Sequence, residues 1–261
     1  MIYAMADIHG NYDYFLRRIK QIESKIVEEG NRLILLGDYI DRGPKSYECL
    51  KLAYDLEQKY GTEKVVVLKG NHEVWFEEFL FENEDVWLSE DDNYCTSGTF
   101  LSEGQIKELE SIFGRENKID YIRNTIRQSH EDLLEWMRKL RLYYETDKQI
   151  FVHAGVDESV PEEEAEWVTL GTPDYVMTGK YPPTKGYFYK DIIAGHVAAS
   201  HLAHDKGFMD IFFDGASHYY IDGSTSKFRR VLCLVYDEKE KKYYQLEEDG
   251  SMKNIRGHQG Q

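Results

Sequence analysis

The chain has few cysteines, no long apolar run and a deficit of positive charge. Its three cysteines, Cys49, Cys95 and Cys233, are odd in number and lack the close spacing of zinc ligands. Neither a disulfide framework nor a thiolate metal site is therefore expected, which fits a reducing compartment. No stretch of about 18 apolar residues is present, and the N-terminus enters a predicted strand at once, so neither a membrane span nor a secretory signal is expected. We predict a cytoplasmic protein.

The charge balance also excludes partners. The sequence has 48 acidic and 32 Lys or Arg residues, which gives a formal net charge of −16. A nucleic acid backbone or an anionic membrane would be repelled by this charge, so we expect neither as a non-specific partner. Bound metal ions would make a local exception for a phosphorylated substrate.

The remaining composition fits one large α/β domain over residues 1–261, since 41% of the residues are hydrophobic. The first part alternates strands and helices: the predicted strands end at Ala6, Leu36 and Leu68, and the predicted helices span 11–29 and 46–60 and begin again at His72. After His196 the predicted elements are short strands, over 208–213, 219–221, 230–236 and 242–246. This pattern predicts a second sheet packed on the first.

Residues 75–147 contain no ligand motif and are predicted to form a helical cap insertion. Helix starts are indicated by Ser102 followed by Gln105, and by Ser129 followed by Asp132. An apolar stripe at helical spacing is predicted to be core: Leu133, Leu134, Met137 and Leu140. A further helical first turn is predicted at Glu162–Glu164, after Pro161.

Polar clusters follow five apolar runs that are predicted as buried strands. The clusters are Asp7-Ile8-His9, Gly37-Asp38-Tyr39-Ile40-Asp41-Arg42-Gly43, Gly70-Asn71-His72-Glu73, His153-Ala154-Gly155 and Gly195-His196. The carboxyl ends of strands are where open α/β sheets build sites. Asp7 and His9 lie two apart, so both side chains leave the same face and can converge on one ion. Carboxylate, amide and imidazole groups of this kind suit Mn, Fe or Zn.

Simpler interpretations of each cluster remain. Gly37-Asp38 could be a turn, Asp41-Arg42 a surface ion pair, and Asn71-His72 a helix N-cap with its first turn. His153 and His196, taken singly, resemble hydrogen-bonded core histidines. The metal hypothesis is favoured because it alone explains why both histidines lie at strand ends beside glycine.

The five motifs, in this order, resemble the metallophosphoesterase superfamily and its phosphoprotein phosphatase branch. That branch includes serine/threonine protein phosphatases and diadenosine tetraphosphate hydrolases. The resemblance extends from Asp7 to the strands near Leu232, and five motifs in register are far more specific than one. It implies an αββα sandwich of two mixed sheets flanked by helices, and a metal-dependent phosphoester hydrolase.

The resemblance also implies a role for each residue. Asp7 and His9 would hold a first divalent metal ion, Asp38 would bridge both ions, and Asn71, His153 and His196 would hold the second. His72 would protonate the leaving group, Asp41 would orient His72, and Arg42 would bind phosphate oxygens with its fork. Two ions, expected to be Mn with Fe or Zn as alternatives, would activate a bridging hydroxide for in-line attack.

The substrate class stays open at this point. The branch usually carries a second phosphate-binding arginine shortly after a tryptophan, and here Thr169 occupies the place where we look for it, with only Lys180, Lys185 and Lys190 nearby. Phosphoserine or phosphothreonine in proteins is the leading substrate, and a dinucleoside polyphosphate is the alternative. A catalytically silent binding module is disfavoured, because all nine candidate site residues are present.

Two further features have both a functional and an ordinary interpretation. Four aromatic residues of the cap could stack on a nucleotide base if they are exposed, although scattered surface rings are expected in a sequence with 14% aromatic residues: Trp75, Phe76, Trp87 and Tyr94. His201 and His204 could form an auxiliary ligand pair, although a polar loop or helix face is the favoured interpretation.

Overall fold

Two mixed β-sheets form the centre of the computed structural model, which describes residues 1–159 and 168–258. The first sheet has six strands in the order β11 (Met252–Asn254), β10 (Lys242–Leu246), β9 (Leu234–Asp237), β1 (Ile2–Met5), β2 (Arg32–Leu35) and β3 (Val65–Val67). The second has five, in the order β4 (Tyr143–Glu145), β5 (Gln149–Val152), β6 (Asp191–Ala194), β8 (His218–Tyr220) and β7 (Phe212–Phe213).

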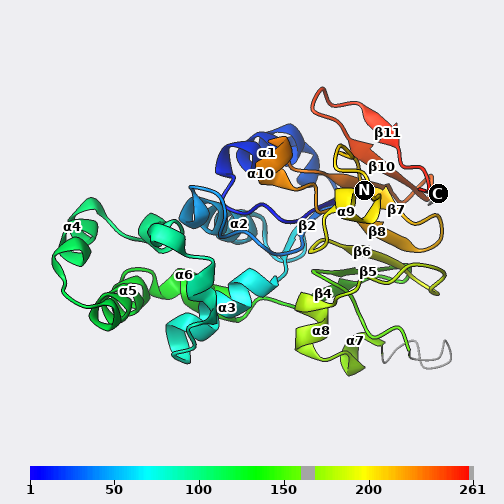
Figure 1. The fold of residues 1–261 in the computed structure, drawn as a ribbon. Helices are drawn as coiled ribbons and strands as arrows, with labels where there is room; N and C mark the ends of the chain where they lie inside the picture. The colour runs from blue at the N-terminus through cyan, green and yellow to red at the C-terminus, as the bar shows by residue number, and fades with distance from the viewer. Residues whose placement is uncertain (160–167, 259–261) are drawn as a thin grey trace.

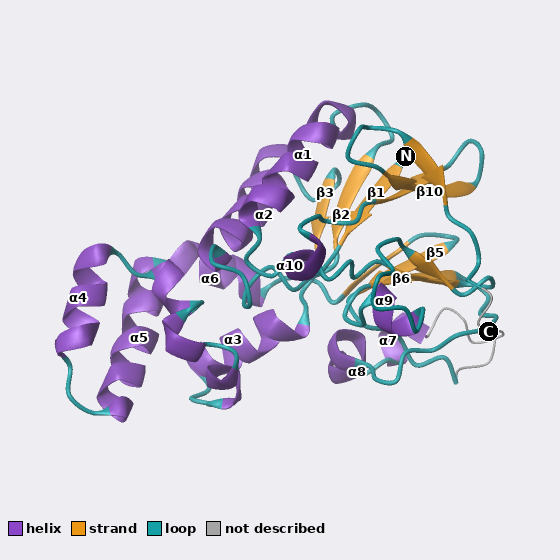
Figure 2. Ribbon diagram, turned by 45° about the horizontal axis from the view of Figure 1, so that its top comes forward, coloured by secondary structure: helices purple, strands orange, loops and turns teal. Residues whose placement is uncertain are grey.

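Helices cover the outer face of each sheet (Figures 1 and 2). The first sheet packs against α1 (Tyr12–Ile26) and α2 (Ser46–Tyr60), and the second against α7 (Val168–Gly171), α8 (Asp174–Gly179) and α9 (Ala199–Leu202). A short helix, α10 (Thr225–Phe228), lies near α1. The layers are therefore helix, sheet, sheet and helix, and the predicted αββα sandwich is confirmed.

The alternation of side chains along the strands produces these layers. In β1, Ile2 and Ala4 face the core between the two sheets, whereas Tyr3 and Met5 face the core beneath the helices. Strand β5 is built in the same way, with Phe151 between the sheets and Ile150 on its outer face. Successive side chains of a strand point to opposite faces, so strands buried on both sides are apolar throughout.

The parallel strands bring their carboxyl ends to one edge of the sandwich. Strands β1, β2 and β3 pair in parallel in the first sheet, and β5, β6 and β8 pair in parallel in the second. The five predicted ligand clusters follow β1, β2, β3, β5 and β6 in turn. The topology therefore brings all five clusters to the same edge of the sandwich.

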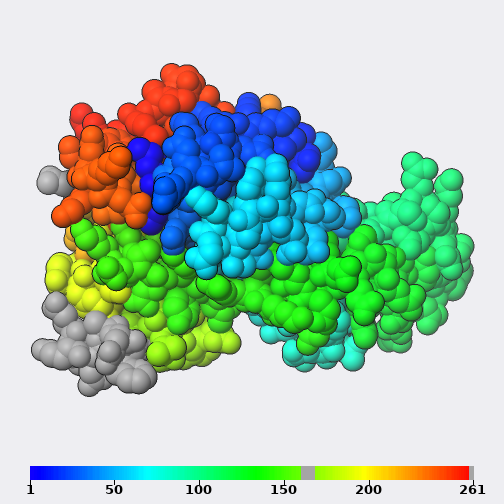
Figure 3. Space-filling view, turned by 180° about the vertical axis from the view of Figure 1, so that it is seen from behind, coloured from blue at the N-terminus to red at the C-terminus, as the bar shows by residue number. Residues whose placement is uncertain are grey.

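A helical region projects from the side of the sandwich (Figures 2 and 3). It contains α3 (Asn71–Phe81), the 3₁₀ turns η1 (Val86–Ser89), η2 (Asp92–Tyr94) and η3 (Ser97–Phe100), and the helices α4 (Glu103–Ser111), α5 (Arg115–Ser129) and α6 (Glu131–Arg138). The strand β4 also falls within residues 75–147, so helices occupy that range only as far as Arg138. The single-domain assignment stays a prediction.

The predicted helix starts had different outcomes. Ser102 forms the expected capping box, with its Oγ accepting from the Gln105 backbone and the Gln105 side chain accepting from the Ser102 backbone at 2.8 Å. The start at Ser129 is wrong, because α5 continues to that residue and α6 has His130 before its first turn. The predicted apolar stripe from Leu133 to Leu140 is buried as expected. The turn predicted at Glu162–Glu164 lies outside the described residues.

No helix within residues 1–159 and 168–258 combines the length and the apolarity that crossing a bilayer requires.

A buried histidine joins the second sheet to the loop after β5. The Nδ1 atom of His218 lies 3.0 Å from an Asp214 oxygen, and its Nε2 atom lies 2.9 Å from Glu158, which also pairs with Lys180 at 2.7 Å. Burial alone would lower the pKa of His218, but the two carboxylates raise it from 6.5 to about 9. The imidazolium therefore holds two segments together.

This contact predicts a loss of stability in alkali. Below pH 6.5 the imidazole is protonated in both folded and unfolded chains, and its contribution is complete. Between pH 6.5 and 9 only the folded chain keeps the proton, so the free energy of unfolding should fall by up to about 3 kcal/mol. Urea unfolding across this range tests it, with His218→Gln as the comparison. An identical pH dependence in both proteins would contradict the assignment.

Candidate metal centre

Many of the predicted site residues adopt the left-handed backbone conformation, which residues other than glycine usually avoid. Six of the nine predicted site residues have left-handed φ angles: Asp7 at 54°, His9 at 48°, Asp38 at 58°, Asp41 at 69°, Arg42 at 64° and His196 at 63°. Residues other than glycine rarely adopt this region, and each such position costs on the order of 1 kcal/mol. Clusters of such strain occur at functional sites, because surrounding contacts maintain a required geometry.

Glu73 is the main contact that maintains the strained segment after β2. Its carboxylate is fully buried and accepts hydrogen bonds from the backbone amides of Asp38 at 2.8 Å, Tyr39 at 2.8 Å and Gly70 at 3.0 Å. The motif at residues 70–73 thus ties the segment after β3 to the segment after β2. The sequence analysis gave Glu73 no role.

Two glycines permit the close approach of neighbouring strand ends. A Cβ atom on Gly70 would lie 2.2 Å from Oδ1 of Asp38, and one on Gly195 would lie 2.1 Å from Oδ2 of Asp7. Both distances are far below contact, so a larger residue would displace the carboxylate. This explains why glycine precedes Asn71 and His196.

Two histidines are oriented by backbone carbonyls so that the same ring atom faces inward. The Nδ1 atom of His9 donates to the Ile40 carbonyl at 2.9 Å, and Nδ1 of His153 donates to the Leu36 carbonyl at 2.8 Å. Their Nε2 atoms lie 3.5 and 3.4 Å from the same Asp38 oxygen. A second hydrogen bond of this kind fixes the tautomer of metal-binding histidines, and it leaves Nε2 available to an ion.

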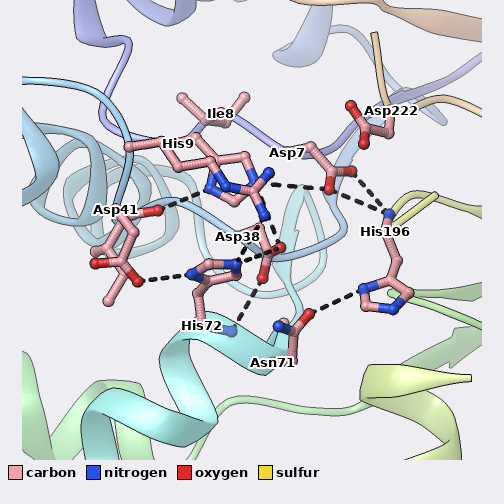
Figure 4. A network of polar contacts seen from close by, with 12 residues as sticks. Asp7, Ile8, His9, Asp38, Asp41, Asn71, His72, His196 and Asp222 are labelled. Carbon is pink, nitrogen blue, oxygen red and sulfur yellow. Dashed lines mark hydrogen bonds and ion pairs between the residues drawn. The ribbon is translucent and has the colours of Figure 1, made fainter. Parts of the chain in front are cut away.

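The remaining predicted ligands lie beside this cluster (Figure 4). The Oδ1 atom of Asn71 lies 3.0 Å from Nε2 of His153 and 3.0 Å from Nδ1 of His196. Asp7 accepts from the His196 backbone amide at 3.1 Å. All six predicted metal ligands are therefore brought together.

The donor atoms form two groups that share one carboxylate. His9, Asp38 and His72 offer ligand atoms within 4.8 Å of one another, and so do Asp38, His153 and His196. The first group contains His72 where Asp7 was expected, while the nearest Asp7 oxygen lies 4.0 Å from Nε2 of His9. Two ion positions that share Asp38 fit this geometry, and nitrogen and oxygen donors fit a borderline divalent metal.

The charges of the site favour a cation. Burial raises the pKa of Asp7 well above its usual range, and the nearby Asp222 carboxylate raises it further. Burial likewise raises the pKa of Asp222 itself. Burial lowers the pKa of His9 to about 3 and that of His196 to about 4, so both rings are neutral at pH 7. His153 is the exception, because Asp38 raises its pKa to about 10. Buried acids beside neutral imidazoles form a cation-binding environment.

His72, Asp41 and Arg42 lie beside the two groups. Nδ1 of His72 lies 2.6 Å from Oδ2 of Asp41, and its Nε2 lies 3.8 Å from Asp38. Burial lowers the pKa of His72, but the Asp38 and Asp41 carboxylates outweigh it and raise the value above 6.5. The two terminal nitrogens of the exposed Arg42 lie 2.9 Å from Nε2 of His9 and 3.3 Å from Nε2 of His72. The guanidinium group of Arg42 therefore lies between His9 and His72 on the exposed side of the site.

Asp222 is a site residue that the sequence analysis missed. It follows β8, the third parallel strand of the second sheet, and lies buried beside Asp7 (Figure 4). The sequence analysis assigned no role to Asp222, although it directly follows the predicted strand over 219–221 as the other clusters follow theirs.

Two of the four cap aromatics cannot stack on a base. Phe76 and Trp87 are fully buried, which contradicts the expectation that they are exposed. Trp75 is partly buried, with its ring centroid 5.1 Å from that of His72, and Tyr94 is exposed. His201 lies on α9 and does not join either ligand group, nor does His204, among the residues that the structure describes.

Thr169 does not lie where a phosphate-binding residue is needed. Its side chain is buried and donates to Glu145 of β4 at 2.8 Å. Glu145 pairs with Ile150, at the opposite end of β5 from His153. The three candidate lysines are engaged elsewhere: Lys180 with Glu158, Lys190 with Glu145, and Lys185 with the Leu202 carbonyl. Arg42 is the predicted phosphate contact that the structure places at the site.

The fold and the site together place the protein in a class: an αββα sandwich with a candidate metal centre at the carboxyl ends of its parallel strands. The calcineurin-like phosphoesterase family matches residues 1–220, and the chain belongs to that family.

Individual relatives match shorter segments. A symmetrical bis(5'-nucleosyl)-tetraphosphatase of Nitrosococcus oceani is 40% identical over 73 residues, which are 28% of this chain and 24% of the relative. Serine/threonine-protein phosphatase 2 of Escherichia coli K12 is 36% identical over 89 residues, 34% of this chain and 37% of the relative. The chain thus spans less than half the length of these curated relatives.

A solved structure supports the fold over nearly the whole chain. The cold-active protein-tyrosine phosphatase of a psychrophilic Shewanella species superimposes with a TM-score of 0.60 at 15% identity, covering 98% of this chain and 80% of that one.

Proposed function

We propose that the protein hydrolyses phosphomonoesters with two divalent metal ions, and that its substrates are phosphoserine or phosphothreonine residues in proteins. The observation that carries the proposal is the Asp38 carboxylate shared by two histidine-containing donor groups, with the His72–Asp41 pair beside it. Such a pair of ions, when bound, supplies charge neutralisation for phosphate oxygens and an activated water.

The side chains have separate tasks in this proposal. Asp7, His9 and Asp38 hold the first ion, and Asp38, Asn71, His153 and His196 hold the second. We propose manganese, with Fe or Zn as alternatives, because the donors are nitrogen and oxygen atoms. A cytoplasmic location agrees with the free cysteines, of which Cys49 and Cys233 are buried.

His72 and Arg42 act on the substrate. Burial opposes protonation of His72, but the Asp38 and Asp41 carboxylates raise its pKa and so favour the protonated ring, whose Nε2 delivers a proton to the departing alkoxide while Asp41 holds Nδ1. The Arg42 fork can bind two phosphate oxygens in place of the two imidazole nitrogens that it now contacts.

A cavity beside Asn71 favours a protein substrate over a dinucleoside polyphosphate. It has a volume of about 530 Å³ and lies between α3 and α8. Four acids and one lysine line it: Glu77, Glu78, Glu82, Asp174 and Lys69. Lys69 already pairs with Glu77 at 2.7 Å. The surplus negative charge would repel additional phosphate groups and attract basic residues that flank a phosphorylated serine.

The test compares substrates under controlled metal content. After chelation the protein should be inactive, and Mn²⁺ should restore hydrolysis of a phosphoserine peptide with basic flanks, with two ions bound per chain by elemental analysis. Diadenosine tetraphosphate, assayed beside it, should have the lower kcat/KM. Absence of Mn²⁺-dependent hydrolysis of either substrate would refute a hydrolase, and a preference for the dinucleotide would overturn the protein substrate.

A further inference from the structure

Trp87 is a buried cap residue whose ring is fixed by other aromatic rings. It belongs to η1, and its side chain is fully buried. The centroids of the Phe76 and Phe79 rings each lie 4.8 Å from the centroid of the indole. Packing of this kind restricts the ring to one orientation, so the indole N–H has a fixed direction.

That N–H is directed at the carboxylate of Asp41. Nε1 of Trp87 lies 3.2 Å from Oδ1 and 3.1 Å from Oδ2 of Asp41. An indole can only donate, and the buried carboxylate can accept from it without losing the 2.6 Å contact to Nδ1 of His72. Within residues 1–159 and 168–258, Trp87 and His72 are the two side chains that hydrogen-bond this carboxylate.

The Asp41 carboxylate needs both partners to keep its orientation. A buried anion with an unsatisfied oxygen is strongly destabilised, so it turns toward whatever donor or water it can reach. If the Trp87 N–H is removed, Oδ1 loses its side-chain donor. The rotation that follows would misalign Nδ1 of His72, and hence the direction of Nε2 toward the reaction site.

We propose that Trp87 is a positioning residue: its indole N–H orients Asp41, which in turn aligns His72 as the proton donor to the leaving group. This proposal rests on the proposed function. Trp87 lies in η1, beyond the end of α3, so the helical region contributes directly to the catalytic geometry rather than only covering the site.

The sharpest test removes the N–H and keeps the ring. Replacing Trp87 with 3-benzothienylalanine substitutes sulfur for N–H in a ring of nearly the same shape. Turnover of a phosphoserine peptide should fall about 10-fold, the equivalent of about 1.4 kcal/mol for one charge-assisted hydrogen bond. Turnover of 4-nitrophenyl phosphate, whose leaving group needs little protonation, should stay near the wild-type value. KM and Mn²⁺ content should not change.

Matched variants separate orientation from packing. Trp87→Phe also lacks the N–H and should show the same selective loss on the peptide. Phe76→Leu disturbs the ring packed against Trp87 but leaves the N–H, so it should lower thermal stability and change both substrates alike. An equal effect of the benzothienyl substitution on both substrates, or no effect on either, would overturn the proposal. Failure of the proposed function is distinguishable, because wild-type protein would then be inactive on both substrates with Mn²⁺.

Discussion

Replacing Asp38 with asparagine is expected to remove most of the divalent metal affinity of the protein. One oxygen of this carboxylate lies 3.5 Å from Nε2 of His9 and 3.4 Å from Nε2 of His153, so it faces both proposed ion positions. The asparagine keeps the shape but loses the negative charge. Mutation of a residue that hydrogen-bonds a metal ligand commonly lowers metal affinity by about 10-fold to 100-fold. Loss of a ligand that two ions share should lower it by more than about 100-fold. Titration calorimetry with Mn²⁺ measures this.

Asp222→Asn is the matched control for Asp38→Asn. It removes one negative charge from another buried carboxylate near the site, at a residue to which we assign no ion. A much smaller loss of affinity is expected. Equal losses in the two variants would mean that the general electrostatic field binds the metal, and wild-type affinity in Asp38→Asn would refute the bridging role.

The position of the site could be predicted from the sequence because strand ends carry it. An apolar run followed directly by Asp, Asn or His requires little tertiary information, and parallel pairing then brings such ends together. The β1, β2 and β3 assignments were correct within about one residue. Four of the six predicted ligands lie in the two donor groups, and Asp7 and Asn71 lie in contact with His196 beside them. Asp222 was missed because an aspartate followed by glycine is also typical of a turn.

Elements that depend on tertiary pairing could not be predicted in the same way. Strand β4 is a three-residue edge strand that exists through its pairing with β5, and β11 is an exposed strand at the other sheet's edge.

Helix α5 begins after Gly114 without a side-chain cap, and it buries Arg123 between Ile122 and Ile126. Arg123 is accommodated because it donates to the Phe79 carbonyl at 2.7 Å. An arginine within the apolar stripe obscures the helical period.

The contacts that orient the candidate catalytic residues were also beyond sequence reasoning. Trp87 is 46 positions from Asp41, and Glu73 reaches amides 34 and 35 positions away. Neither spacing belongs to a local motif. Only the folded chain reveals that Trp87 donates a hydrogen bond to Asp41 and that Glu73 accepts hydrogen bonds from backbone amides after β2. The sequence left base stacking by the cap aromatics open, whereas the fold buries Phe76 and Trp87 inside the protein.

Replacing His72 with asparagine should slow turnover of a phosphoserine peptide by about 100-fold to 10,000-fold, because the alkoxide would leave without a proton. Asparagine has no group that can replace the imidazolium, whose pKa is raised by Asp38 and Asp41 although burial opposes this shift. The loss should shrink on 4-nitrophenyl phosphate, and elemental analysis should still find two ions per chain. His201→Asn, at an exposed histidine of α9, is the control and should match the wild type on both substrates. Equal losses on the two substrates would contradict the role of His72 as proton donor. A loss of metal in His72→Asn would make His72 a metal ligand, which its position in the donor group with His9 and Asp38 permits.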